Sequence, residues 1–126
     1  MTTSYESDED AQVFDRSALL DSLRGDHELL QQFIDLFLRD FPGKIETLRE
    51  AAPNEDGTGT ANTEVLRIAA HKVLGSARTM RLHRLAAAAL ALEQLAEAPS
   101  YRPKDLAAGA ERVHREYQRV AAILQR

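Results

Sequence analysis

The sequence predicts an all-α fold, an antiparallel up-down-up-down four-helix bundle with a short additional N-terminal helix. Apolar residues recur every three to four positions in four long segments, which is the period of a helix that buries one face. No segment of the sequence shows the strict alternation of apolar and polar residues typical of a half-buried strand. The breaks between the long segments are short, so we expect each helix to run opposite to its neighbour.

The chain is expected to begin with a disordered acidic tail over residues 1–12, followed by a single domain over residues 13–126. The tail is short of apolar residues and rich in Asp and Glu, a composition typical of solvated segments. The short helix then begins near Phe14, with Asp15 or Ser17 as its N-cap, and ends at Gly25.

The first long helix is predicted to follow Asp26, which is a favourable N-cap residue. Its apolar stripe continues to Leu48, and Pro42 lies inside it. Because the stripe stays in register beyond the proline, we expect Pro42 to bend the helix rather than end it. An exposed loop follows over residues 53–62, which are dense in Pro, Gly, Asn and Asp.

The second long helix is predicted to start at the N-cap Asn62 and to end at a turn over residues 79–82. On a helical wheel at about 100° per residue, its core stripe consists of Leu66, Ala69, Ala70, Val73, Ala77 and Met80. Two more helices follow, separated by a break at residues 98–103 that contains two prolines. Their inward residues are expected to be Leu85, Ala89, Leu92 and Leu95 in the first, and Leu106, Ala110, Val113, Tyr117, Val120 and Leu124 in the second.

His71 and Gly75 are predicted one turn apart on the outward face of the second long helix. Glycine inside a helix costs roughly 0.8–1.0 kcal/mol relative to alanine, which indicates that something bulky approaches the imidazole closely. A neutral imidazole is a competent nucleophile near pH 7. Arg67 and Arg78 lie on the same side of the wheel, where they could pair with the oxygens of a phosphoryl group.

The residues at this point of the chain read His71-Lys72-Val73-Leu74-Gly75-Ser76. This segment resembles the His-x-Leu-Lys-Gly-Ser motif of the histidine-containing phosphotransfer (HPt) domain family. The resemblance extends over roughly residues 13 to 125 and includes segments 23–30, 33–42 and 91–96. It implies a phosphocarrier of a multistep two-component phosphorelay, in which His71 accepts a phosphoryl group from the aspartate of a receiver domain and passes it to another receiver.

Two positions depart from the family's pattern. Leu74 stands where the family usually carries a lysine, and Arg81 stands where it usually has glycine at the turn into the next helix. Neutralisation of the phosphoryl group would then fall to other cations of this chain. The candidates are Arg67, Arg78, Lys72 and Lys44.

The resemblance also implies a surface around His71 that docks response-regulator receiver domains, either separate or within a hybrid sensor kinase. Ile68 and Leu74 are the expected apolar contacts of this surface, and Gly75 with the adjacent Ser76 gives clearance for the partner. The receiver would supply the metal ion, so we expect no cofactor and no metal site in this chain. The other three histidines form no i, i+4 pair, so we expect no metal binding by them. The sequence contains no P-loop, so we expect no kinase or ATPase activity.

Composition narrows the possible functions further. The 126 residues, 44% hydrophobic and 29% charged, suit one compact domain with its own core. A net charge of -4 argues against nucleic acid as the main partner. The longest apolar-rich run, residues 85–92, is too short to cross a bilayer, and neither a signal peptide nor a membrane anchor is visible. With no cysteine in the chain, the cytoplasm is the expected compartment, and one apolar stripe per helix can be buried within a monomer.

Two other classes of function stay open from the sequence. An HPt-like adaptor could dock receivers or other signalling proteins without being phosphorylated, although such a protein has no chemical reason to keep His71. A bundle that serves only oligomerisation would need a large apolar stripe on its outer surface, and the helical wheel of the histidine helix shows none.

Overall fold

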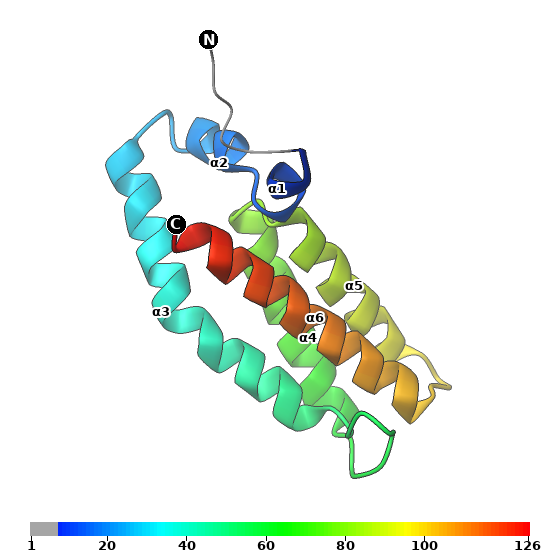
Figure 1. Ribbon diagram of the computed structural model, residues 1–126. Helices are drawn as coiled ribbons and strands as arrows, with labels where there is room; N and C mark the ends of the chain where they lie inside the picture. Colours follow the sequence, from blue (N-terminus) through cyan, green and yellow to red (C-terminus); the bar gives the residue numbers. More distant parts are fainter. Residues whose placement is uncertain (1–7) are drawn as a thin grey trace.

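The computed structural model describes residues 8–126 and is all-helical over them, as the sequence predicts (Figure 1). Two short helices are followed by four long ones joined by short connections. The bounds are Asp8–Val13 for α1, Arg16–Ser22 for α2, His27–Ala51 for α3, Thr63–Thr79 for α4, His83–Glu97 for α5 and Pro103–Leu124 for α6. Within the described residues, no helix is long and apolar enough to cross a membrane.

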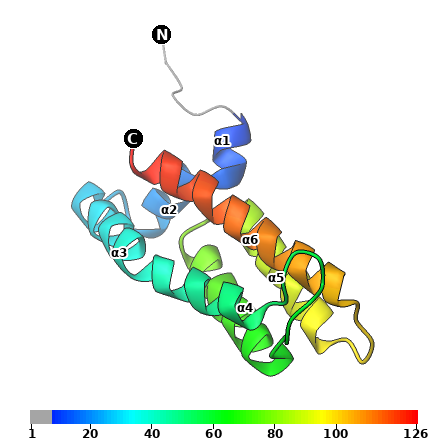
Figure 2. The same cartoon turned by 60° about the horizontal axis from the view of Figure 1, so that its bottom comes forward.

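The four long helices lie side by side around one apolar core (Figures 1 and 2). α4 packs against α3 and α5, and α6 packs against the same two helices from the other side. Every residue of the predicted α4 stripe is buried, as are most of the inward residues predicted for the other three helices. The 3.6-residue period therefore identified the buried face of each long helix correctly.

α3 begins and continues as predicted. The side chain of Asp26 accepts a hydrogen bond from the amide of Leu29 at 2.9 Å, which caps the helix. The helix runs on through Pro42 without ending there. Around this point, the rings of Phe37, Phe41 and Tyr117 stack and tilt against one another, with centroids 4.2 to 6.3 Å apart, and so fix α3 against α6.

The N-terminal segment differs from the prediction. The disordered tail was expected over residues 1–12; residues 1–7 lie outside the described part, but residues 8–12 belong to α1. The short helix expected between Phe14 and Gly25 is present as α2, capped by Asp15, but a second short helix, α1, precedes it. The composition argument failed because Val13 and Phe14, which follow the acidic residues, are buried and hold α1 against α5 and α6. An ion pair between Asp10 and Arg126 at 3.0 Å adds to this contact.

The turn between α4 and α5 is a Schellman motif. The amide of Leu82 donates to the carbonyl of Ala77 at 2.8 Å, and the amide of Arg81 donates to that of Arg78 at 3.2 Å. Arg81 has a φ of 61°, in the left-handed region that favours glycine. A glycine at this position would fit the backbone without that strain, so the departure at Arg81 changes the conformational cost of the turn and leaves its geometry intact.

Candidate functional site

His71 is held on the outward face of α4 by the way that helix folds. Asn62 accepts a hydrogen bond from the amide of Val65 at 3.1 Å and so caps the start of the helix. The stripe from Leu66 to Ala77 is buried on the opposite face. As a result, the side chain of His71 is 69% exposed, and it projects from the face of α4 that points away from the core.

Glu93 of α5 fixes the orientation of the imidazole ring. Its Oε2 lies 2.8 Å from Nδ1 of His71, and its side chain is only 12% exposed. An ionised carboxylate can only accept hydrogen bonds, so with Glu93 ionised this contact requires the proton on Nδ1. In the neutral ring Nε2 is then left with a free lone pair, and the exposed ring offers that atom to a partner.

Glu93 was not among the residues predicted for the site. The sequence does contain a signal for it, because Glu93 directly follows Leu92 in a segment that is otherwise rich in alanine and leucine. Glutamate is almost never buried without a partner. A carboxylate at the edge of the predicted apolar stripe of α5 therefore indicates a polar partner on an adjacent helix.

Gly75 has no structural reason to be glycine within the described residues. It lies inside α4 with a helical backbone, and a Cβ atom added to it would meet no heavy atom within 4 Å. By contrast, a Cβ at Gly109 of α6 would come within 3.0 Å of Leu92, so that glycine serves helix packing. The open space at Gly75 lies on the outside of the molecule, one turn from His71, as predicted from the sequence.

The four predicted cations differ in their contacts and exposure. Arg67 is bound to Glu64 by a hydrogen-bonded ion pair, and this contact raises the pKa of Arg67 and lowers that of Glu64. Lys72 and Arg78 are exposed on α4. Lys44, whose direction the sequence could not establish, projects from α3 toward α4, and its Nζ lies 3.3 Å from Oγ of Ser76.

The expected apolar docking contacts are only half correct. Ile68 is 40% exposed beside His71, but Leu74 is 4% exposed and belongs to the core. The prediction that Leu74 presents an apolar contact to a partner is wrong. Leu74 is one of the buried residues of α4, so the replacement of the family's usual lysine removes a cation from the site without adding an exposed apolar surface.

Other apolar residues beside the site were not predicted. Leu36 of α3 is 48% exposed and Val65 of α4 is 39% exposed. Leu36 lines a groove between α3 and α4, which we call the α3–α4 groove. Its remaining lining residues are Phe33, Phe37, Asp40, Phe41, Lys44, Gly75, Ser76, Thr79 and Met80.

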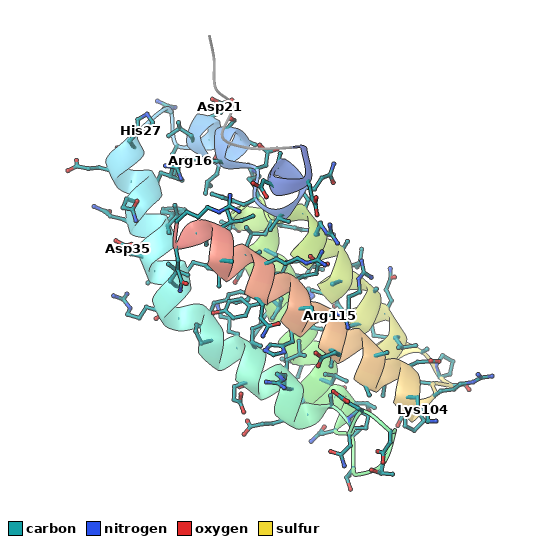
Figure 3. All side chains as sticks on the ribbon, viewed as in Figure 1. Arg16, Asp21, His27, Asp35, Lys104 and Arg115 are labelled. Carbon is teal, nitrogen blue, oxygen red and sulfur yellow. The ribbon has the colours of Figure 1, made fainter. Side chains whose placement is uncertain are left out.

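The other histidines lie apart from His71. His27 is the first residue of α3 (Figure 3). His83 pairs with Asp15 at 3.3 Å, and His114 on α6 lies 3.9 Å from Glu111. Residues 8–126 contain no group of three His, Cys, Asp or Glu side chains that could hold a metal ion.

An exposed imidazole, fixed at one nitrogen and open at the other on the surface of a helical bundle, is the arrangement of a nucleophilic carrier. The profile of the Hpt domain family matches residues 28–123, which contain both His71 and Glu93. The chain therefore belongs to the Hpt domain family. Neither the comparison with curated proteins nor the comparison with solved structures gave a match. Membership of this family implies histidine phosphotransfer in a phosphorelay by a phosphocarrier module that interacts with receiver domains and lacks a kinase activity of its own.

Proposed function

We propose that this chain accepts a phosphoryl group on Nε2 of His71 from the aspartyl phosphate of one receiver domain and passes it to the aspartate of another. The contact between Nδ1 of His71 and Glu93 carries this proposal. It favours the tautomer in which Nε2 is free to act as the nucleophile, and the exposure of the ring leaves room for a partner to reach it.

The proposed transfer needs no proton to leave the ring. Nε2 attacks the phosphorus in line, the bond between phosphorus and the aspartate oxygen breaks, and that aspartate departs as a carboxylate. The ring then carries positive charge, because Nδ1 keeps its proton and Nε2 is bonded to phosphorus. Glu93 lies 2.8 Å away and would stabilise this charge in the transition state.

The partner would dock on the faces of α3 and α4 that flank His71. Ile68 and Leu36 offer apolar contacts there, and Gly75 with Ser76 leaves room for the approach of the receiver's active site. The proposal assigns the metal ion and the acidic cluster of the reaction to the receiver, and no cofactor, kinase or ATPase activity to this chain. It applies equally to a separate receiver and to one within a hybrid sensor kinase.

The same proposal covers the architecture and setting of the molecule. The alternating course of α3, α4, α5 and α6 in Figure 1 supports the antiparallel up-down-up-down bundle expected from the sequence. Because each long helix turns its apolar stripe into the shared core, we propose that the domain acts as a monomer. The net charge of -4 supports protein rather than nucleic acid as the partner, and the absence of cysteine supports the cytoplasm as the compartment.

Incubation with several receiver domains, each phosphorylated beforehand by a small-molecule donor, tests the function. Acid-labile phosphate on the chain is measured by intact mass. The unaltered chain and His27→Gln, a control at another exposed histidine, should each gain one phosphoryl group, whereas His71→Gln should gain none. Binding of the receivers without any labelling would contradict the proposal and would indicate an adaptor that docks receivers without being phosphorylated.

A further inference from the structure

Lys44 brings a cation from a second helix to the edge of the site. It lies on α3, and its Nζ is 3.3 Å from Oγ of Ser76 and 5.9 Å from the centre of the Phe41 ring. Ser76 directly follows Gly75, which is one helical turn after His71. The ammonium group therefore contacts α4 about one and a half helical turns beyond His71.

Lys44 differs from Arg67 in what it contacts and from Arg78 in where it lies. Arg67 already has Glu64 as its partner. Arg78 lies about two turns beyond His71, roughly 10 Å along the helix axis. Lys44 instead contacts a neutral hydroxyl group and the face of an aromatic ring. A doubly charged phosphoryl group is a stronger partner for an ammonium group than either of these.

Lys44 lies in a groove beside residues of α4 that follow His71 in the sequence. Lys44, Gly75 and Ser76 line the same α3–α4 groove. A side chain built at Gly75 would meet nothing within 4 Å, so α4 places no side chain there to block the lysine. The flexible four-carbon stem of lysine allows its ammonium group to turn away from Ser76 toward His71.

We propose that Lys44 is the cation that contacts the transferred phosphoryl group in this chain. It rests on Ser76 while His71 is unmodified, and it turns to the phosphoryl oxygens as the bond from phosphorus to Nε2 forms or breaks. No proton leaves the lysine in this step, since it acts only through its charge. The inference rests on the proposed function and names the residue that stabilises the group being transferred.

The experiment begins with His71 loaded by phosphoramidate, a small donor that requires no receiver. The rate of transfer to an unphosphorylated receiver is then measured for Lys44→Gln and for Lys104→Gln, a control at an exposed lysine near the start of α6 (Figure 3). Loss of Lys44 should slow transfer about tenfold or more, the effect of removing one hydrogen bond to a charged group. Lys44→Arg should keep most of the rate, and Lys104→Gln should stay close to the unaltered chain.

A second measurement separates phosphate contact from a purely structural role. The ¹⁵N shift of the Lys44 ammonium group should change when His71 is loaded, and that of Lys104 should not. Equal transfer rates for Lys44→Gln and Lys104→Gln on fully loaded protein, or an unchanged Lys44 signal, would overturn the role of Lys44 and leave the carrier function intact. Failure of phosphoramidate and of all receivers to label the unaltered chain would overturn both.

Discussion

Two features distinguish the surroundings of His71, a contact that orients its ring and a nearby glycine that leaves open space on the surface of α4. Glu93 holds Nδ1 at 2.8 Å, while Gly75 is a helix-interior glycine with no neighbour that requires it. The first feature stabilises a defined tautomer of the ring. Gly75 lowers the stability of α4, and no contact within the described residues requires a glycine there. This is consistent with a surface that another molecule approaches.

Gly75→Ala should stabilise the isolated domain and slow its reaction with receivers. Alanine removes the cost of glycine in a helix, so the free energy of unfolding should rise by roughly 0.8–1.0 kcal/mol. Urea unfolding measures this change, and transfer from a phosphorylated receiver should be slower, more so for Gly75→Leu. The matched variant Gly109→Ala should give no such gain, because its new methyl group would lie 3.0 Å from Leu92. A destabilised Gly75→Ala protein would show that this glycine serves the fold.

Glu93→Ala should impair transfer while His71 is still present. Without an acceptor at Nδ1, the proton of the neutral ring is free to move to Nε2, and the positive charge formed on transfer has no partner. Removal of a hydrogen bond to a charged group predicts a rate about 10- to 100-fold lower. Glu93→Gln should lose less, since its amide oxygen still accepts. The control is Glu97→Ala, an exposed position one turn further along α5, and a transfer rate equal to that control would refute the role of Glu93.

At the scale of single residues, the sequence did not predict contacts between helices. The orientation of His71 followed from the period of α4, but its partner comes from α5, and a wheel for one helix contains no information about contacts between helices. The same limit explains the error at Leu74. Its wheel position borders the stripe, and only the packing of α4 against its neighbouring helices buries it.

At the scale of elements, the caps and the turns determine how the helices are joined. Asp15 accepts a hydrogen bond from the amide of Ala18 at 3.1 Å, and its own amide donates to the carbonyl of Arg81 at 3.0 Å. Its carboxylate also pairs with His83 at 3.3 Å. One residue therefore starts α2 and ties the N-terminal segment to the turn between α4 and α5. The sequence identified Asp15 as a possible cap, but it could not show this long-range tie.

Asp15 should contribute stability that depends on pH. The hydrogen bond from Ala18, and then that from His83, lower the pKa of Asp15 below its ordinary value of 3.8. A carboxyl group whose pKa is lower in the folded state stabilises the protein above its unfolded pKa, and this contribution is lost as the pH falls through the folded pKa. The loss should therefore occur below about pH 4, and it should be modest because the side chain is partly exposed.

Urea unfolding at pH 7 and pH 3 tests this contribution. Asp15→Ala should lower the free energy of unfolding at pH 7 by about 1 kcal/mol, the usual value of an N-cap. Asp15→Asn should keep most of the cap and should lose less stability than the unaltered chain between the two pH values. An unchanged difference between pH 7 and pH 3 in Asp15→Asn would rule out this contribution.

For the whole molecule, the all-α class followed from the sequence because the apolar period is strong in each of the four long helices. The N-terminal helix α1 did not, because its stability depends on Val13 and Phe14 being buried by α5 and α6 rather than on its own acidic residues. Local composition describes a segment that forms its structure alone. The structure of a segment that folds only by packing against the bundle can be predicted only when the structure of the bundle is known.

The bundle as a whole leaves the ring of His71 exposed while Glu93 occupies one of its nitrogens. The proposed transfer therefore specifies which atom of which residue carries the phosphorus. A receiver aspartyl phosphate should leave its group on Nε2 of His71, with the proton of Nδ1 still held by Glu93.

The most direct test is an NMR measurement of the ¹⁵N-labelled chain after phosphorylation by a receiver, which reads the coupling of phosphorus to the ring nitrogens. We expect one phosphohistidine, with phosphorus on Nε2 and a proton on Nδ1, and no such signal in His71→Gln. Phosphorus on Nδ1, or on any residue other than His71, would contradict the proposed transfer.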